Sequence, residues 1–292
     1  MELKYRTIPE NEGGGAIPDC GTIHKSEVKP TLDKLSDDLG FHIDLNDFAI
    51  GSTGKKEYSG DLDLVLGDYE WGHGPVAFKK HLDLIYNEND TRRTGTMIHL
   101  KYPIVNYKEE LQERKPRTGF VQVDFIFGDV KWEKIFHFSA GAESEYKGFH
   151  RNILISAICT ALATEVSDKL DTFGRPVSQI RWKFGPKGFV QVERVSTFNE
   201  SSGKVHKKQK DTQLTTPVFD FHAVIGTLFP ESNTLFDLDS VETLMNAVKR
   251  NYDKNTQEKV WKQIVYDLSM RDDAKMFIYP PEIAKYISEN DK

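Results

Sequence analysis

Apolar residues recur along this chain at two spacings, one typical of helices and one typical of strands. Between residues 26 and 39 they return every three or four positions and stop at Gly40, which predicts a helix with one apolar face. Further helices are expected at 146–166, 240–250, 257–270 and 281–288, and the segment 69–87 is expected to open as a loop and continue as a helix. Strands are expected at 61–66, 97–105 and 120–127, with two more within 180–197 around a turn at 184–188.

The order of these elements predicts an α+β fold of two domains. A mixed sheet with helices on one face is expected for residues 26–138, and a mostly helical domain with a β-hairpin for 139–292. Residues 1–25 are polar and contain three consecutive glycines, so a flexible N-terminal arm is expected there. The charged segment 108–117 is expected to be an exposed connection between two strands.

The composition is ordinary for a soluble protein. Of 292 residues, 38% are hydrophobic and 29% are charged, and the net charge of −6 gives no global sign of nucleic-acid binding. The chain has no apolar run long enough for a membrane span, and its first residues lack the apolar core of a signal peptide, so a cytoplasmic protein is expected. Cys20 and Cys159 lie at no metal-ligand spacing. A disulfide between them stays open, although reduced thiols fit the cytoplasm better.

The most specific polar pattern lies at residues 51–63. A turn of small residues that begins with Gly51 and Ser52 can approach a phosphate closely, and a strand with Asp61 and Asp63 follows it. Residues two apart on a strand point the same way, so the two carboxylates project together while the leucines beside them face a core. Adjacent carboxylates repel each other unless a proton or cation lies between them. Mg²⁺ takes oxygen ligands and is often bound by carboxylates and substrate phosphates together, so this pattern predicts a metal site.

A third acid, Asp124, lies in the apolar run 120–127, which predicts a second strand of the same sheet. The order of a Gly-Ser turn, an Asp-x-Asp strand and a lone aspartate on a later strand resembles the DNA polymerase β-type nucleotidyltransferase superfamily. Poly(A) polymerases, CCA-adding enzymes, oligoadenylate synthetases and aminoglycoside nucleotidyltransferases belong to this group. The resemblance covers residues 48–128, which is under a third of the chain.

The resemblance implies a palm-like catalytic domain. Such a domain moves a nucleoside monophosphate from an NTP, ATP included, to a hydroxyl acceptor without a template and releases pyrophosphate. Gly51 and Ser52 are implied as triphosphate ligands, with two Mg²⁺ ions, or Mn²⁺, as cofactors. One ion is expected on Asp61, Asp63 and Asp124, and the other on the first two and the triphosphate. Asp124 is expected to take or relay the proton of the acceptor hydroxyl.

Basic residues on a helix after the third aspartate often contact the triphosphate in this superfamily. The resemblance therefore implicates Lys147 and Arg151, which lie four positions apart near the start of the expected helix at 146–166. A solvated helix face is the alternative for both side chains.

The best indication of the acceptor is the segment 175–210. It holds nine Lys or Arg residues against two acids, a local charge of +7, and its interleaved aromatic residues are Trp182, Phe184, Phe189 and Phe198. A basic groove with aromatic platforms holds single-stranded nucleic acid without reading its sequence, so an RNA end is the expected acceptor. The alternative is a surface hairpin whose aromatic side chains face the core.

Rival interpretations of these signals stay open. An Asp-x-Asp pair also serves metal-dependent glycosyltransferases. The acids could be solvated groups at a strand end or sheet edge, and the Gly-Ser pair could be a plain helix N-cap. Nucleotidylation of a protein or small molecule, and a non-catalytic nucleotide- or RNA-binding module, are the alternative functions. The chain has no Walker loop, no dinucleotide-binding glycine motif and no His-Glu-x-x-His, which argues against those three classes.

Overall fold

The computed structural model describes most of the chain and divides it into two compact units. The units are Met1–Gly148 and Phe149–Lys292, whereas the sequence places the boundary after residue 138. The described residues are 15–41, 43–67, 73–108, 117–140, 144, 146, 148–165, 178–201, 204–231, 234–269 and 280–290. Eight α-helices and two four-stranded sheets lie in this part of the chain, so the expected α+β class is confirmed.

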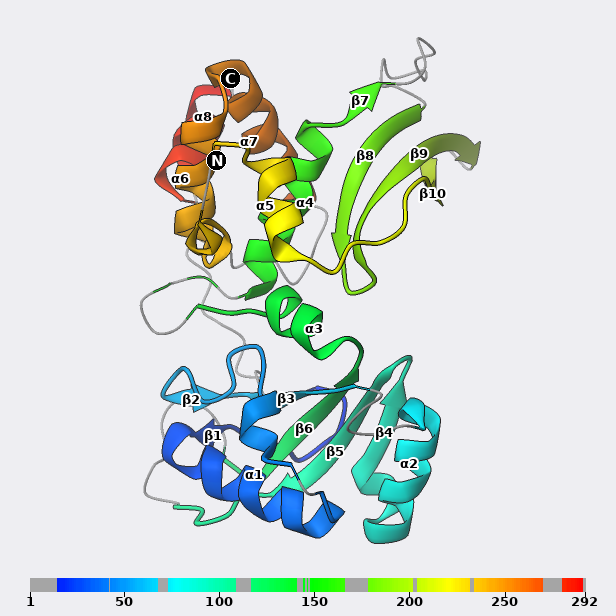
Figure 1. Ribbon diagram of the computed structural model, residues 1–292, viewed down its shortest axis with the longest axis vertical. Coiled ribbons are helices and arrows are strands. Elements are labelled where there is room, and N and C mark those ends of the chain that lie inside the picture. The colour runs from blue at the N-terminus through cyan, green and yellow to red at the C-terminus, as the bar shows by residue number, and fades with distance from the viewer. Residues whose placement is uncertain are drawn as a thin grey trace. The chain divides into compact units, whose positions relative to one another are not determined.

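The first unit is built on a mixed sheet (Figure 1). Its strands are β3 (Asp61–Leu66), β4 (Thr91–Thr94), β5 (Met97–Pro103) and β6 (Phe120–Phe127), in the order β3-β6-β5-β4. Strands β3 and β6 are parallel, and the other two pairs are antiparallel. The remaining elements are β1 (Ile23–His24), α1 (Lys25–Leu39), η1 (Leu45–Phe48), β2 (Tyr58–Ser59), α2 (Gly74–Ile85), η2 (Glu88–Asp90) and α3 (Val130–Phe136).

The two faces of this sheet differ sharply because side chains alternate along each strand. Leu62, Leu64, Val123, Phe125, Ile98 and Leu100 are fully buried against Leu32 and Leu35 of α1 and Phe78 and Leu82 of α2. Both helices therefore cover one face of the sheet, as Figure 1 shows. The opposite face, called the polar face here, carries Asp61, Asp63, Gln122, Asp124 and His99. The expected mixed sheet is thus confirmed, with α1 and α2 on one face, but Val130 of α3 packs against Val65 and Ile126 on the other face.

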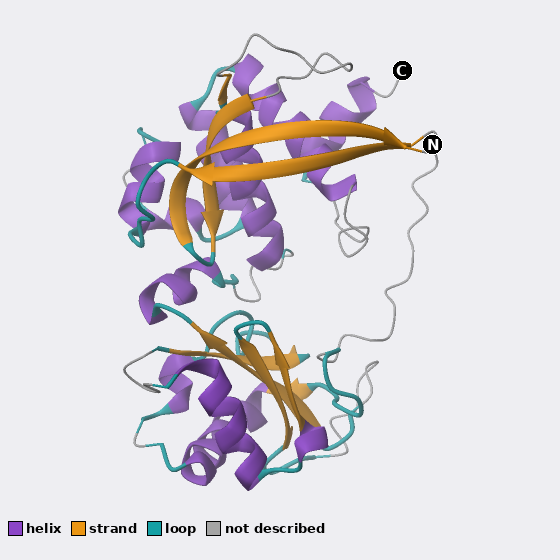
Figure 2. Ribbon diagram, turned by 90° about the vertical axis from the view of Figure 1, so that its right-hand side faces the viewer, coloured by secondary structure: helices purple, strands orange, loops and turns teal. Residues whose placement is uncertain are grey.

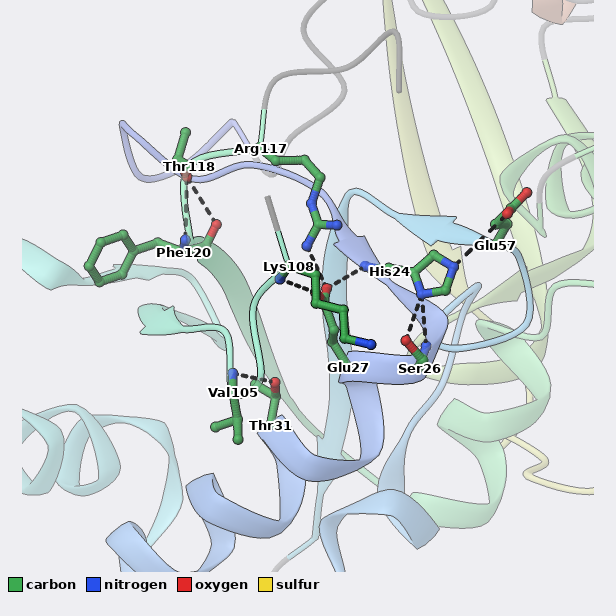
Figure 3. A network of polar contacts seen from close by, with 10 residues as sticks. All are labelled: His24, Ser26, Glu27, Thr31, Glu57, Val105, Lys108, Arg117, Thr118 and Phe120. Atoms are coloured by element: carbon green, nitrogen blue, oxygen red, sulfur yellow. Dashed lines mark hydrogen bonds and ion pairs between the residues drawn. The ribbon is translucent and has the colours of Figure 1, made fainter. Parts of the chain in front are cut away.

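A buried ion pair fixes the start of α1 to the connection between β5 and β6 (Figure 3). Glu27 is 1% exposed, and its carboxylate accepts hydrogen bonds from the backbone N–H groups of His24 and Lys108, both at 3.0 Å. Arg117 Nη2 completes the set at 2.5 Å from Glu27 Oε2. Three donors on one carboxylate leave the buried charge well compensated. Helix α1 is thereby held to two points far away in the sequence.

Arg117 corrects one expectation. It closes the segment 108–117, which the sequence predicts to be exposed, yet its side chain is buried because it is the counter-charge of Glu27. Residues 109–116 of that segment lie outside the described part.

The N-terminal segment also differs from the expected flexible arm. Residues 15–25 pack on the sheet: Ile17 and Ile23 are buried, and β1 pairs with β2. The N–H groups of Ala16 and Ile17 both donate to Gln122 Oε1 at 3.1 Å. Two apolar anchors and these hydrogen bonds outweigh the local glycine-rich composition. Residues 1–14 lie outside the described part.

The second unit combines helices with a larger sheet than the expected hairpin. Its strands are β7 (Thr164–Glu165), β8 (Ser178–Gly185), β9 (Gly188–Ser201) and β10 (Lys204–Gln213), all antiparallel in the order β10-β9-β8-β7. Figure 2 shows β9 and β10 as the longest pair of strands. The helices are α4 (Gly148–Ala161), α5 (Phe221–Leu228), η4 (Leu235–Leu238), α6 (Val241–Asn251), α7 (Lys254–Ser269) and α8 (Pro281–Asn290).

The hairpin of β8 and β9 confirms the two strands expected within 180–197. The polar segment 199–210, by contrast, continues β9 and forms most of β10. A strand held by backbone pairing and by polar side-chain contacts such as those of Asp211 needs no apolar period, so sequence pattern does not reveal it. Among the described residues, no helix is both long and apolar enough to cross a membrane. Cys20 and Cys159 are free thiols, and burial raises their pKa values to about 11 and about 12.

The first prediction concerns the buried pair. Glu27→Gln should lower the free energy of unfolding by about 3–5 kcal/mol, because the uncharged amide leaves Arg117 buried without a counter-charge and points an N–H group at one of three donors. Urea unfolding followed by circular dichroism measures the loss. Asp33→Asn is the control, since it breaks an exposed pair with Lys29 on the same helix and should barely move the midpoint. Equal effects of the two substitutions would contradict a special role for Glu27.

Candidate functional site

The three candidate aspartates meet on the polar face of the first unit. Asp63 of β3 lies directly beside Asp124 of β6, and Asp61 lies beside Gln122, because the two parallel strands pair in that register. One carboxylate oxygen from each aspartate lies within 4.8 Å of the others. The expected convergence of the three side chains is therefore present. Residues 61 and 63 are partly buried and Asp124 is buried, so the solvated-acid and sheet-edge alternatives fit this geometry poorly.

The three carboxylates repel one another, so the cluster favours a bound proton or cation. The pKa of the Asp63 carboxyl is raised well above its usual range, first by burial and then by the charges of Asp61 and Asp124. Without a cation, one proton or one unfavourable charge must stay in the cluster. The donor set consists of carboxylate oxygens alone, which suits Mg²⁺ or Mn²⁺ and not a thiolate- or imidazole-seeking metal. The residues thus fit the expected ions.

The Gly-Ser turn is fastened to the middle of this cluster. The Ile50 N–H donates to the carbonyl of Asp63 at 2.9 Å, and the Asp63 N–H donates to Thr53 Oγ1 at 2.9 Å. Gly51 has φ +64°, and a Cβ atom placed there would lie 2.6 Å from Asp63 Oδ2. Glycine adopts this left-handed backbone without strain and leaves room for the Asp63 carboxylate, which a Cβ atom would force to shift. Ser52 follows, partly exposed, in the same turn.

The helix N-cap alternative for Gly51 and Ser52 is wrong. Residues 51–55 form turns, and the next regular element is β2. Thr53 is the turn residue that sequence reasoning missed, because its role is a hydrogen bond to a strand backbone ten positions away. Within this turn the N–H groups of Thr53, Gly54 and Lys55 donate to Ile50 O, Ser59 Oγ and Ser52 O. A turn beside a carboxylate cluster is still a place where a phosphate can share a cation with the acids.

Two further residues on the polar face were missed by the sequence analysis. His99 Nδ1 and Gln122 Nε2 each lie 2.8 Å from Asp124 Oδ1, and both side chains are buried. Gln122 precedes Asp124 by two positions, so strand alternation alone could have placed it there. His99 is the cross-strand partner of Asp124, a register that pattern does not give.

Neither of the two basic candidates for the triphosphate lies among the described residues of the first unit. Lys147 lies outside the described residues. Arg151 is 2% exposed within the second unit, where its Nε donates to the carbonyl of Leu238 and its guanidinium lies 5.6 Å from the Phe221 ring centre. Burial lowers its pKa to about 10. A solvated face is thus wrong for Arg151, while a role at the triphosphate stays a prediction.

The basic segment 175–210 is partly neutralised within its own sheet. Arg194 reaches both carboxylate oxygens of Asp211, at 2.7 and 2.9 Å, and Lys183 lies 3.0 Å from the second. These cations hold the pKa of Asp211 well below its usual range. Arg181 is buried, whereas Lys187 is exposed. Fewer cations therefore face solvent than the sequence suggests.

The aromatic residues of this segment are divided between core and surface. Phe184 and Phe189 are buried, as the core-facing alternative expects. Trp182 stacks on Phe189 at 4.5 Å between ring centres and is partly exposed. The side chain of Phe198 lies outside the described part. An aromatic platform for RNA bases thus reduces to Trp182 among the described side chains.

Comparison with models of known protein families found no match, and a search of the curated proteins found no match either. Chemistry at this site is therefore inferred from its residues and their geometry.

The second prediction isolates the contact between the turn and Asp63. Gly51→Ala should destabilise the protein by more than Gly95→Ala. Both glycines have φ above +60°, a strain of roughly 1–2 kcal/mol for alanine. Only the position of Gly51 has a carboxylate oxygen in the way, since nothing lies within 4 Å of a Cβ at Gly95. Urea midpoints of the two variants measure the difference. Equal losses would argue against the close approach.

The third prediction follows from the raised pKa of Asp63. A group with a raised folded-state pKa contributes stability below its unfolded value, near 3.8, and loses it as pH rises through the folded value. In EDTA at about pH 7, Asp63→Asn should therefore raise the melting temperature, by roughly 2–4 °C for each kcal/mol gained. The gain over the parent should shrink towards about pH 4, where the parent carboxyl is protonated.

Calorimetry of parent and variant across this pH range tests the sign. Asp47→Asn, at an exposed position, is the control and should show no such pH-dependent gain. A destabilised Asp63→Asn at neutral pH would mean that the carboxylate has a structural partner rather than an excess of like charge.

Proposed function

We propose that the first unit is the palm-like catalytic domain of a metal-dependent nucleotidyltransferase. It moves a nucleoside monophosphate from an NTP to a hydroxyl acceptor and releases pyrophosphate, without a template. The observation that carries this proposal is the approach of Asp61, Asp63 and Asp124 to within 4.8 Å of one another beside the Gly51 turn. Carboxylates that can hold metal ions beside a phosphate-binding turn are what transfer between phosphates and hydroxyls requires.

In this proposal each group has a separate task. Asp61, Asp63 and Asp124 hold Mg²⁺, which, when bound, makes the acceptor hydroxyl more acidic and neutralises charge on the leaving pyrophosphate. The hydroxyl of Ser52 and the backbone N–H of the same residue, which directly follows Gly51, hold the β- and γ-phosphates. The acceptor oxygen forms a bond to the α-phosphorus, and the bond between that phosphorus and the bridging oxygen to the β-phosphate breaks. Asp124 takes or relays the hydroxyl proton, and the electron pair leaves with pyrophosphate.

Asp124 is suited to the proton transfer by its asymmetric surroundings. Its Oδ1 accepts hydrogen bonds from His99 and Gln122 at 2.8 Å, whereas the bond to Oδ2 is longer, at 3.1 Å. Oδ2 is therefore the better proton acceptor of the two oxygens in this proposal.

An RNA end is the proposed acceptor. Arg194 and Lys183 are engaged by Asp211, and Arg181 is buried. Support comes from exposed Lys187, from the partly exposed Trp182, and from four lysines within the ten residues of β10. Polyanion binding through such lysines should weaken as salt rises, because each phosphate contact releases a counterion.

The fourth prediction is the transfer itself. The full chain with Mg²⁺ and each NTP in turn, labelled at its α-phosphate, should transfer label to total RNA, and not to protein or small hydroxyl compounds. Asp63→Asn and Asp124→Asn should each lose this activity, and so should the parent in EDTA, because the cluster can no longer hold two ions. Asp47→Asn should keep full activity, since that side chain is exposed outside the cluster. Gel electrophoresis reads the products.

Each other outcome has a distinct meaning. Label on protein or a small molecule, with the same dependence on Asp63, would keep nucleotidyl transfer and replace the acceptor. Activity that survives both aspartate substitutions would refute the site. NTP binding without any transfer would favour the non-catalytic nucleotide-binding module.

A further inference from the structure

Two side chains hold the carboxylate of Asp124. Oδ1 lies 2.8 Å from Nδ1 of His99 and 2.8 Å from Nε2 of Gln122, and Oδ2 lies 3.1 Å from the same amide nitrogen. All three side chains are buried. A carboxylate only accepts hydrogen bonds, so both neighbours act as donors and Nδ1 of His99 carries a proton. Hydrogen bonds from His99 and Gln122 together restrict the Asp124 carboxylate to one orientation.

The donors are themselves fixed. Oε1 of Gln122 accepts the N–H groups of both Ala16 and Ile17 at 3.1 Å, so its NH₂ group must face Asp124. The carbonyl of Ala16 in turn accepts a hydrogen bond from Arg92 Nη1 at 3.0 Å. A chain of hydrogen bonds thus runs from β4 through the N-terminal segment to Gln122.

His99 is fixed by strand pairing instead. It lies on β5 directly across from Asp124 on β6, so its imidazole needs only to reach over one strand spacing. Asp63, Asp124, His99 and Arg92 therefore form one row across all four strands of the sheet. In this row the acidic members lie on β3 and β6, and the hydrogen-bond donors lie on β5 and β4.

We propose that His99 and Gln122 are positioning residues for Asp124, and that the backbone of Ala16 and Ile17 anchors one of them. The proposal rests on the metal-binding role given to the aspartates under the proposed function. In this proposal both residues act on Asp124, a metal ligand, rather than on the substrate. Their donors hold the Asp124 carboxylate in the orientation in which it meets Asp63, so an ion entering the site finds this ligand already placed.

Mn²⁺ binding to the full chain, without nucleotide, tests the proposal through the electron paramagnetic resonance of the free ion. Asp63→Asn should abolish binding. His99→Leu and Gln122→Met should each weaken binding by roughly 10- to 100-fold, the usual cost of losing a group that orients a metal ligand. His99→Asn should recover most of the loss, because its amide NH₂ lies near the place of the imidazole Nδ1. If His99 had only a structural role, folded His99→Asn would bind Mn²⁺ no more tightly than folded His99→Leu.

A second measurement, free of metal, tests the contact itself. In EDTA the destabilisation caused by His99→Leu should be smaller in the Asp124→Ala background than in the parent, because the hydrogen bond is already gone. If His99→Leu does not fold, Gln122→Met takes its place in both the Mn²⁺-binding and the stability measurements. Unchanged Mn²⁺ affinity in the folded His99 and Gln122 variants, alongside loss in Asp63→Asn, would overturn the positioning role and leave the proposed function standing. A parent chain that binds no Mn²⁺ would overturn both.

Discussion

The candidate site depends on the parallel pairing of β3 with β6 in one register. Because side chains alternate along both strands, this register sets the two faces of the sheet together. Leu64 meets Phe125 in the core, and Asp63 meets Asp124 on the polar face. A slip by one residue would turn the aspartates towards α1 and α2 and the core side chains towards solvent. Burial of the apolar face therefore holds like charges at close distance on the other.

Magnitudes show why the fold can hold this repulsion. Two unit charges 4.8 Å apart repel by about 3–4 kcal/mol at an effective dielectric constant near 20. Each fully buried leucine or phenylalanine contributes about 1.5–3 kcal/mol of transfer free energy. The burial of a few apolar side chains beneath the strands thus offsets the repulsion of one pair of charges. The repulsion is concentrated at Asp63, whose pKa is raised by burial and by the charges of Asp61 and Asp124. The cost is local, while the stabilising burial is shared by the whole sheet.

Sequence pattern was informative for most elements on which burial imposed a period, although the short helix α5 was missed despite its buried face. The helix expected at 26–39 is α1, and the strand expected at 61–66 is β3 with the same bounds, because both bury one face in the same core. Strands β4 and β10 were missed because they are held by pairing with β5 and β9, and the side chains of β4 are mostly exposed.

The candidate site divides in the same way. Its acids could be found because charges in an apolar strand are unusual, and alternation predicts that they share a face. His99 was missed because its role depends on the pairing of β5 with β6, which are separated by the 16 residues 104–119 in the sequence. The burial of Arg117 was missed because its partner, Glu27, lies 90 positions away. Local periodicity carries no record of such distant partners.

The turn at Gly51 has a further consequence for the behaviour of the protein in solution. Strand β3 lies at the edge of its sheet, and an exposed edge strand can pair with another chain and start aggregation. The hydrogen bond from Ile50 to Asp63 and the bridge between Ala49 and Leu64 cover part of that edge. Conditions that loosen the turn would expose an edge rich in leucine. The segment of Ala49, Ile50 and Gly51, which lies beside the carboxylates, thus also limits self-association through the edge of the sheet.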